Sequence, residues 1–338
     1  MTTTKKQRKT LPVSAGALAV QLCRRTFEEN GLDYEELFGL EEKTKAIWDP
    51  VRQRLIKKSV VEQDEMRSFH EHFAIKCFHG GRNECLHAGF SESHYSYQTF
   101  RLVHDYDLIG AYTTGLVLIR EIDYAKSFQT QELAEFLGDA MGFALVDFDY
   151  PDDVQYPALP VRCDERGLLF PLQGRSYATA PELALAQAQG AEIDIRRGVI
   201  YPWKDPNGVR IFAPFVREIR RLRKQYPKGS VSEQTAKLLG NSLYGKTGQG
   251  LRDKTAFDTH VMESLKVPHS GLTNAPIAAL TTGFVRAVIG EILHRLPPHC
   301  TVFSVTTDGI LTDAREDELD LTGPLCQRYL QLCAMVQS

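Results

Sequence analysis

The rest of this chain is organised around one stretch, Lys-Leu-Leu-Gly-Asn-Ser-Leu-Tyr-Gly at residues 237–245. On a helix the polar positions of this stretch share one face: Lys237, Gly240, Asn241 and Tyr244. The opposite face carries Leu238, Leu239, Ser242 and Leu243. This face suits a nucleotide: the ammonium can bind the phosphates, the amide and the phenol ring can lie beside the base, and the glycine lets a large group approach closely. Gly245 is expected to end the helix. If only the spacing of apolar residues is considered, an ordinary amphipathic surface helix without a ligand is the alternative interpretation.

The literal string matches, residue for residue, the Lys-x-x-x-Asn-Ser-x-Tyr-Gly motif of family B DNA polymerases. The chain resembles the protein-primed, organellar and viral branch of that family from roughly Phe69 to Asp313. This resemblance implies that Lys237 binds the leaving phosphate and Asn241 senses the base pair. It also implies that Tyr244 stacks near the templating base and that Gly245 contacts DNA.

Composition sets only broad limits on function. The 338 residues are enough for one large domain or two to three subdomains, and the net charge of −3 carries no global sign of nucleic-acid binding. Seven cysteines without a Cys-x-x-Cys pair argue against a zinc site or a disulfide frame. We find no apolar run of transmembrane length and no signal peptide, so no membrane partner is expected. Residues 1–10 form either a disordered tail or an arm that touches nucleic acid.

A second motif lies in residues 99–109, which are expected to form a strand. Alternation places Asp105 and Asp107 on one face, where they face either solvent or a divalent cation. The segment from Asp107 to Thr113 resembles the family motif Asp-x-x-Ser-Leu-Tyr-Pro, although Gly110, Ala111 and Thr113 depart from it. The resemblance implies that Asp107 and the backbone carbonyl of Leu108 bind metal. It also implies that Tyr112 lies under the incoming sugar and excludes a 2′-hydroxyl.

A third motif lies in residues 301–313, which read as strand, turn, strand. Asp-Gly between apolar runs is a hairpin signal, and a plain hairpin is the alternative. The segment resembles the family motif Tyr-x-Asp-Thr-Asp-Ser, with Thr307 and Asp308 on its last Thr-Asp and Thr306 in place of its first aspartate. The resemblance implies that Asp308 is the second metal-binding carboxylate. It also implies two Mg²⁺ ions as cofactors, for which Mn²⁺ can substitute.

The string Phe-His-Gly-Gly-Arg at residues 78–82 is either a turn or a nucleic-acid contact. It resembles the Tyr-x-Gly-Gly motif of the family, which contacts single-stranded template. The expected DNA contacts are therefore Phe78, Gly80, Gly81 and Arg82.

A basic helix is expected at residues 214–226, followed by a tight turn and by Ser230 and Glu233 at the spacing of a capping box. Its cations form either a solvated face or a triphosphate site in which Arg221, Arg223 and Lys224 lie near Lys237. We expect Arg223 to share the phosphates with Lys237. Further helices are expected at residues 14–27, 129–143, 181–189 and 274–296. A helical stretch is also expected at residues 41–69, interrupted near Pro50, and another at residues 316–337, broken near Gly323-Pro324.

The expected fold is α+β, a right-hand polymerase core with an antiparallel palm sheet, a two-helix fingers hairpin and a helical N-terminal region. Residues 1–98 form the connecting region with the template-binding loop. Residues 99–213 form the first part of the palm, with an insertion at about 154–200. Residues 214–247 form the fingers, and residues 248–338 the second part of the palm, with a small insertion at about 248–272. Exonuclease and thumb are expected to be missing.

The leading functional hypothesis is the core of a DNA-directed DNA polymerase that adds dNTPs to a 3′-hydroxyl, with a primer-independent enzyme as a variant. The alternative is a non-catalytic DNA-binding remnant or an accessory subunit of a split polymerase. Expected partners are template-primer DNA, dNTPs and either a terminal priming protein or a chain that supplies exonuclease and thumb. A bacterial, plasmid or viral origin predicts a cytoplasmic location, and an organellar origin is the other alternative.

Overall fold

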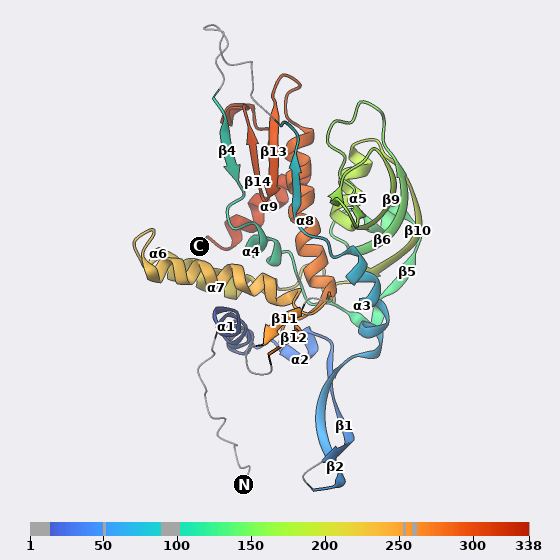
Figure 1. Ribbon diagram of the computed structural model, residues 1–338, viewed down its shortest axis with the longest axis vertical. Coiled ribbons are helices and arrows are strands. Elements are labelled where there is room, and N and C mark those ends of the chain that lie inside the picture. The colour runs from blue at the N-terminus through green and yellow to red at the C-terminus, as the bar shows by residue number, and fades with distance from the viewer. Residues whose placement is uncertain (1–13, 50–51, 89–101, 253–254, 259–261, 338) are drawn as a thin grey trace.

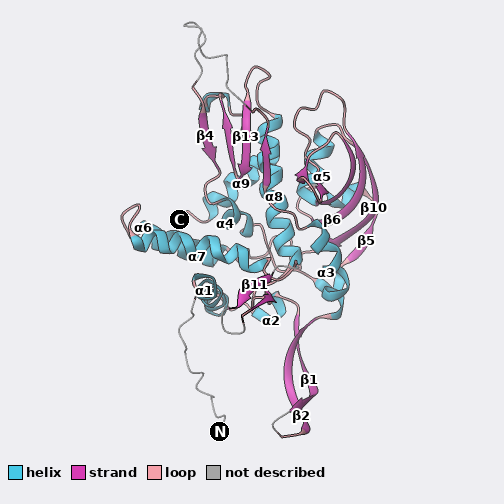
Figure 2. Cartoon of the chain, in the orientation of Figure 1, coloured by secondary structure: helices cyan, strands magenta, loops and turns pink. Residues whose placement is uncertain are grey.

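A long buried helix, α8 (Ala275–His294), runs through the middle of the molecule. The computed structural model describes residues 14–49, 52–88, 102–252, 255–258 and 262–337. Two four-stranded antiparallel sheets flank α8, and helices fill the space between the layers (Figures 1 and 2). The fold is thus a mixed α/β arrangement with antiparallel sheets.

The first sheet brings together strands from the two ends of the chain. Its order is β3-β13-β14-β4, with β3 at Arg82–Cys85, β13 at Val302–Thr307, β14 at Gly309–Thr312 and β4 at His104–Asp107. The expected hairpin at residues 301–313 is confirmed. The strand expected at residues 99–109 is confirmed only as the shorter β4, and residues 99–101 lie outside the described part of the chain.

The second sheet has the order β5-β10-β6-β9 and carries α5 (Ala180–Ala188). Its strands are β5 at Phe128–Thr130, β6 at Met141–Asp149, β9 at Gln173–Thr179 and β10 at Glu192–Tyr201. The expected helix at residues 129–143 is therefore wrong, because β5, a 3₁₀ turn at Leu133–Phe136 and the start of β6 occupy it. Pairing of β6 with a strand on each side buries Phe143 and Val146 and outweighs the local helical period. The expected helix at 181–189 is confirmed.

Two antiparallel helices, α6 (Ala213–Lys224) and α7 (Val231–Thr247), form a hairpin that extends from the middle of the molecule to its left edge in Figure 1, and α1 (Ala15–Glu29) packs against α7. Both hairpin helices and α1 were expected. Gly245, however, lies inside α7, which is capped by Gly248. Leu239 and Leu243 are buried as expected, whereas Leu238 is 53% exposed.

The helix α8 begins where its sequence predicts, because the side-chain oxygen of Asn274 accepts a hydrogen bond from the Ile277 N–H. By length and composition α8 is apolar enough to cross a membrane, which corrects the sequence-based statement that no apolar run has that length. Every residue of α8 from Ala275 to Leu293 is buried among other elements, as expected for a core helix.

The N-terminal region is only partly helical. The helix expected at residues 41–69 is wrong, because β1 (Leu40–Asp49) and β2 (Arg54–Gln63) pair as a long antiparallel ribbon before α3 (Glu65–Cys77). Cross-strand neighbours such as Ile47 and Ile56 stabilise extended pairing, a long-range effect that helical periodicity ignores. The ribbon projects away from the body of the molecule (Figure 1).

The remaining elements are short. The break expected near Gly323-Pro324 is confirmed, because α9 (Pro324–Met335) begins there with Gly323 as its N-cap. The helix expected before the break is replaced by a 3₁₀ turn at Glu316–Glu318. The other elements are α2 at Tyr34–Leu37, α4 at Ala111–Leu116, a 3₁₀ turn at Tyr124–Lys126, β7 at Val161–Cys163, β8 at Gly167–Leu169, β11 at Thr255–Asp258 and β12 at Glu263–Lys266.

Candidate active site

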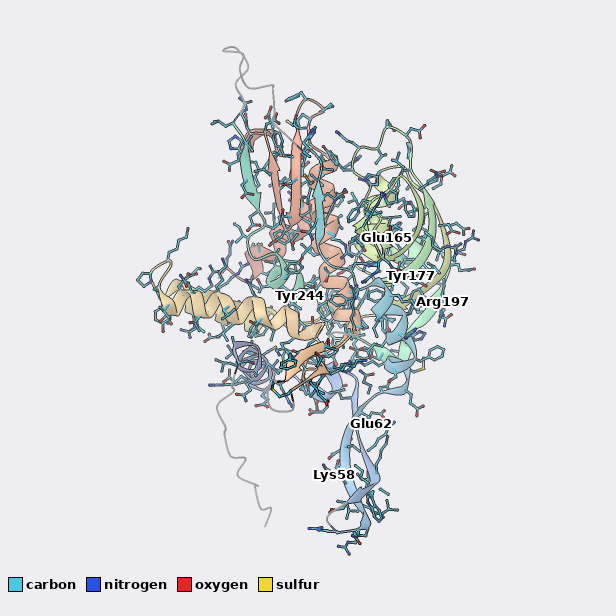
Figure 3. All side chains as sticks on the ribbon, viewed as in Figure 1. Lys58, Glu62, Glu165, Tyr177, Arg197 and Tyr244 are labelled. Carbon is cyan, nitrogen blue, oxygen red and sulfur yellow. The ribbon has the colours of Figure 1, made fainter. Side chains whose placement is uncertain are left out.

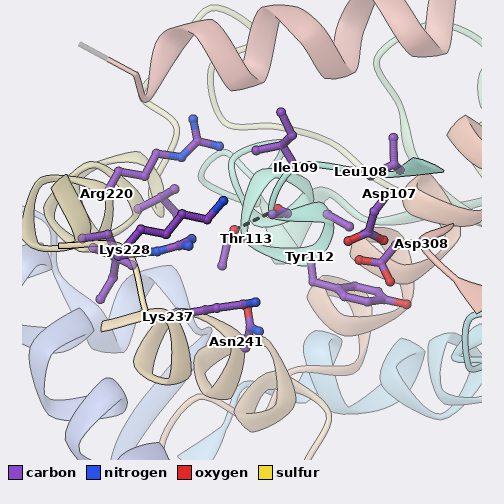
Figure 4. Close-up of a pocket in the computed structure, with 16 residues that line it drawn as sticks. Asp107, Leu108, Ile109, Tyr112, Thr113, Arg220, Lys228, Lys237, Asn241 and Asp308 are labelled. Carbon is purple, nitrogen blue, oxygen red and sulfur yellow. Dashed lines mark hydrogen bonds between the residues drawn. The ribbon is translucent and has the colours of Figure 1, made fainter. Parts of the chain in front are cut away.

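Two carboxylates converge at one edge of the first sheet. Asp107 ends β4 and pairs with Gly309, while Asp308 occupies the turn just before Gly309. A Cβ on Gly309 would lie 3.2 Å from Oδ1 of Asp107, so a glycine leaves room for that carboxylate. The Leu108 N–H donates to the Asp308 carbonyl at 3.0 Å, which ties the two segments together. Figure 4 shows the two carboxylates facing each other.

The turn that carries Asp308 is strained. Thr307 has a φ of +63°, a left-handed conformation that β-branched residues rarely adopt. Its neighbours hold it there, because Thr307 pairs with Arg82 of β3 and its hydroxyl donates to the side-chain oxygen of Asn83 at 3.3 Å. Gly81, the residue before β3, packs closely on Thr307, since an added Cβ would lie 2.7 Å from Cγ2 of Thr307. Gly81 therefore supports the turn of Asp308.

The electrostatics of the pair favour a cation. Burial and the nearby Asp107 charge raise the pKa of the Asp308 carboxyl above its usual range. Like charges held this close repel each other, and a divalent cation between them removes that repulsion. The carboxylates of Asp107 and Asp308 are the donors that fit such a cation, and Leu108 lines the same cavity.

A cavity of about 690 Å³ opens from the two carboxylates towards α6 and α7. Figure 4 shows Asp107 and Asp308 at one end, with Lys228 and Lys237 at the other. The cations that line the cavity are Arg220, Arg223, Lys228 and Lys237. This distribution suits a polyanion bound through a metal at one end and through ammonium and guanidinium groups at the other.

The expected set of cations is partly wrong. Arg221 is not among the residues that line the cavity and forms a two-point ion pair with Glu218, at 2.7 and 2.8 Å. Lys224 donates instead to the Gln337 carbonyl at 2.9 Å. Arg220 and Lys228 replace them in the lining. The face of α6 that meets the cavity has the i, i+3, i+4, i+7 spacing of Val216, Ile219, Arg220 and Arg223.

Arg223 and Lys237 do lie in the same cavity, as expected. The guanidinium of Arg223 is bound at 2.7 Å by Glu233 of α7, and this hydrogen bond lowers the pKa of Glu233. The expected capping box is half formed: Ser230 Oγ accepts from the Glu233 N–H, but the Glu233 carboxylate turns to Arg223 and the Gly229 N–H. The pair thereby holds α6 and α7 together at the cavity wall.

Two stacked tyrosines separate this cavity from a second one. The Tyr112 and Tyr244 rings lie 4.3 Å apart at 14°, and Tyr244 also hydrogen-bonds Thr282 of α8 at 2.6 Å. Burial raises the pKa of both phenols, so they stay neutral. Tyr112 lines the first cavity together with Asn241. A rigid aromatic wall therefore stands beside the carboxylates.

Two departures from the family pattern, on either side of Tyr112, have a structural reason. Gly110 has a φ of +64°, which glycine adopts without strain, and it forms the N-cap of α4. The Thr113 hydroxyl donates to the Gly110 carbonyl at 2.8 Å and closes the turn. Gly110 and Thr113 together orient Tyr112 toward the cavity.

The second cavity, of about 370 Å³, contains most of the predicted template contacts. Phe78, Gly80, Tyr244 and Gly245 all line it. Its cation is one that the sequence analysis missed, Arg252, which donates to the Phe78 carbonyl and lies over the Phe78 ring. Aromatic rings, glycines and a guanidinium around one hollow suit a single-stranded nucleic acid.

Two members of the predicted DNA-binding loop lie elsewhere. Arg82 is only 2% exposed, and its guanidinium contacts Glu84, the Pro157 carbonyl and the Phe170 ring, so it is not placed to hold a phosphate. Gly81 packs on Thr307 rather than lining the second cavity. Neither position supports its predicted DNA contact, because burial and packing are decided by segments distant in the sequence.

The second cavity is braced by a buried network. Arg286 of α8 donates to the Gly80 carbonyl at 2.6 Å and pairs with Glu182 of α5 at 2.7 Å, with both side chains at most 1% exposed. Beside it, burial and Arg286 lower the pKa of His79 to about 3, so this imidazole is neutral and Nε2–H donates to the Tyr177 carbonyl at 2.8 Å. The network fixes the loop at residues 78–81 on the core.

With the fold and the geometry of both cavities described, comparison with known families places the chain. The family model described as DNA polymerase type B, organellar and viral, matches residues 106–274, half of the chain. The chain belongs to this family.

Individual relatives refine this placement. The chain is 43% identical over 334 residues to the primer-independent DNA polymerase PolB of Escherichia coli, covering 96% of this chain but 38% of that protein. Its structure resembles Phi29 DNA polymerase in complex with primer-template DNA and incoming nucleotide, with a TM-score of 0.57 and 10% identity over 90% of this chain and 49% of that one. A second Phi29 complex, with primer-template DNA, gives a TM-score of 0.52. These solved structures support the fold.

Proposed function

We propose that this chain is the catalytic core of a DNA-directed DNA polymerase that adds dNTPs to a 3′-hydroxyl. The observation that carries the proposal is the convergence of Asp107 and Asp308 at one end of a cavity whose other end is cationic. Membership of the type B DNA polymerase family supports the same activity. The alternative of a non-catalytic DNA-binding remnant becomes an outcome of the test below.

In this proposal the first sheet, with α8 behind it, is the palm, and the α6–α7 hairpin is the fingers. The connecting region up to residue 98 carries the ribbon β1–β2 and the template loop. The second sheet belongs to the insertion between the two parts of the palm, and it spans more than the expected 154–200, because β5 and β6 precede residue 154. The hairpin β11–β12 is the small insertion at about 248–272.

The proposed cofactor is a pair of Mg²⁺ ions, for which Mn²⁺ can substitute. Bound metal supplies charge neutralisation and activation of the attacking oxygen in phosphoryl transfer. Asp107, Asp308 and the Leu108 carbonyl would hold it. The two carboxylates, Asp107 and Asp308, repel each other, and a bound cation would relieve this repulsion. This fit supports the assignment of metal to the site.

The other residues of the cavity position the nucleotide. Lys237 and Lys228 would bind its phosphates, and Lys237 would stabilise the negative charge that develops on the leaving group. Arg223, oriented by Glu233, would hold the phosphates from the α6 side. Tyr112 would stand beneath the sugar and exclude a 2′-hydroxyl, while Asn241 would sense the base pair.

The second cavity would receive the template strand. Phe78 and Tyr244 offer ring faces for bases, and Arg252 offers a cation for the backbone. Gly80 and Gly245 leave open space, since a Cβ at either would meet no atom within 4 Å. Tyr112 would then lie on the side of the incoming nucleotide and Tyr244 on the side of the template strand, both beside the new base pair.

The test is Mg²⁺-dependent dNTP incorporation on a primed template by the full chain. We expect incorporation that falls at least a thousandfold in Asp107→Asn and in Asp308→Asn, because each removes a charge that metal needs. DNA binding without incorporation, unchanged by either substitution, would establish the non-catalytic alternative. Omitting the primer from the same reaction tests whether priming resembles that of the primer-independent relative.

A further inference from the structure

The ribbon β1–β2 is the largest feature that the proposed active site leaves unexplained. Each strand has ten residues in continuous antiparallel register, so the ribbon is roughly 33 Å long. At its base β1 packs against α2, and the rest projects from the body (Figures 1 and 3). A fold does not maintain such an exposed two-stranded element for its own stability.

The outer half of the ribbon is strongly basic. Residues 45–58 contain five basic residues and one acidic residue, in a chain whose net charge is −3. Lys57 and Lys58 are adjacent on β2 and therefore point to opposite faces, and both are exposed. Lys58 lies directly opposite Lys45, whose ammonium is paired with Glu62, so Lys58 is the exposed cation of this cross-strand pair. Figure 3 shows Lys58 on the projecting part of the ribbon.

The same half carries an uncovered apolar pair. Trp48 and Leu55 are cross-strand neighbours that are 58% and 65% exposed. They share a face with Lys57, because cross-strand partners and alternate residues lie on the same side of a ribbon. The ribbon therefore combines an exposed aromatic ring with cations on both of its faces. This pattern is typical of surfaces that bind nucleic acid.

The base of the ribbon is fixed to the template loop. β2 leads into α3, whose buried Arg67 donates to Glu71 at 3.1 Å and to the Thr273 carbonyl at 2.9 Å. α3 ends at Cys77, and the next residue, Phe78, lines the second cavity. The ribbon lies on the side of α7 opposite the first sheet (Figure 1). DNA that passes Phe78 away from the carboxylates therefore moves towards the ribbon.

We propose that the ribbon binds duplex DNA ahead of the templating base. A two-stranded β-ribbon fits the major groove, about 12 Å wide, and cations on both of its faces would meet the phosphates of both groove walls. A length of roughly 33 Å corresponds to about one turn of B-DNA. The proposal rests on the proposed function only for the direction of the template, since the charge and shape of the ribbon stand alone.

The experiment measures binding of gapped DNA to the full chain, with and without a duplex segment of roughly 12 base pairs ahead of the gap. The sequence has two tryptophans, and Trp203 is buried with its indole N–H bound at 2.8 Å to the Asp139 carbonyl, so Trp48 fluorescence reports on the ribbon. We expect the downstream duplex to tighten binding and quench fluorescence. The quenching should disappear in Trp48→Phe.

The variant Lys57→Ala/Lys58→Ala removes one cation from each face. Each lost phosphate contact flattens the slope of log affinity against log salt by about 0.9, so we expect a change of roughly 1.8 and about a tenfold loss per contact near 50 mM salt. The matched control, Arg166→Ala/Arg315→Ala, removes two exposed basic residues outside the ribbon and should bind like the wild type.

Three results would overturn the proposal. The slope of log affinity against log salt could be the same for the wild type and the ribbon variant, or single-stranded DNA alone could quench the Trp48 fluorescence. The ribbon variant could also change the oligomeric state of the protein while leaving its affinity for DNA unchanged. The proposed function fails separately, if the wild-type chain fills no gap with any divalent metal. Ribbon-dependent DNA binding in that case would leave the present inference standing.

Discussion

Gly81 offers a sharp test of how the metal site is positioned, because its role is purely steric. Its φ is not in the left-handed region, so alanine is compatible with its backbone. An added Cβ would nevertheless lie 2.7 Å from Cγ2 and 2.9 Å from Cα of Thr307, and 3.0 Å from the Tyr112 hydroxyl. Ordinary contact begins at 3.4 Å, so Gly81→Ala forces a displacement of about 3.4 − 2.7 = 0.7 Å.

The turn of Asp308 has little freedom to absorb this displacement. Thr307 is already strained at a φ of +63° and is held by its pairing with Arg82 of β3. Overpacking of this kind costs about 1–3 kcal/mol of stability. A shift near 1 Å at a reacting centre can reduce the rate by about a hundredfold. We therefore expect incorporation by Gly81→Ala to fall by roughly that factor, with a folded protein and a higher Mg²⁺ requirement.

The assay is single-turnover incorporation at saturating DNA over a range of Mg²⁺ concentrations, with thermal unfolding of the same samples. Gly80→Ala is the matched control, because a Cβ there meets no atom within 4 Å. Since Gly80 lines the second cavity, its alanine variant should weaken template binding and leave the rate at saturating DNA unchanged. If Gly81→Ala shows the wild-type rate and the wild-type Mg²⁺ dependence, the turn is not positioned by this contact.

Three further predictions follow from the buried and charged groups of the site. The pKa of His79 is lowered from 6.5 to about 3, so neutral His79 contributes its full stability to the fold above about pH 6.5 and less as the pH falls. At pH 5 the loss in the free energy of unfolding is about 2 kcal/mol. The variant His79→Gln should therefore flatten this part of a stability–pH curve measured by denaturant unfolding. Lys228→Ala removes a cation that lines the cavity and should raise the KM for dNTP roughly tenfold. Arg221→Ala removes a cation that pairs with Glu218 instead and should change the KM less than about twofold. Equal effects of the two variants in steady-state kinetics would contradict the assignment of the cavity cations. Glu182→Ala leaves the guanidinium of Arg286 buried without its carboxylate and should lower the free energy of unfolding by about 3–5 kcal/mol; a loss below about 1 kcal/mol would show that the pair is dispensable.

Local chemistry explains what was predictable from the sequence. The helix at 231–247, the capped helix at 275–294 and the Asp-Gly hairpin each follow from side-chain period, a capping group or turn geometry within a few residues. The expectation that Asp107 and Asp308 belong to one site came from motif identity, and pairing of β4 with β14 brings them together.

The errors arose where distant segments decide the outcome. Considered without the rest of the chain, residues 41–49 are compatible with a helix. In the fold they pair with residues 54–63, and this pairing stabilises extended strands. Arg82 looked like a free cation, yet Glu84 and the Pro157 carbonyl bury it. No local pattern reports which partner a side chain meets after folding.

For this chain, amino-acid sequence alone determined which chemical groups are available and which of them share a helix face or a turn, because those relations depend only on backbone geometry over a few residues. The tertiary structure decided which face of α6 lines the cavity, so that Arg220 is selected over Arg221. It also placed Asp107 beside a residue 308 − 107 = 201 positions away. Such relations depend on burial and strand pairing across the whole fold, where contributions from many segments compete.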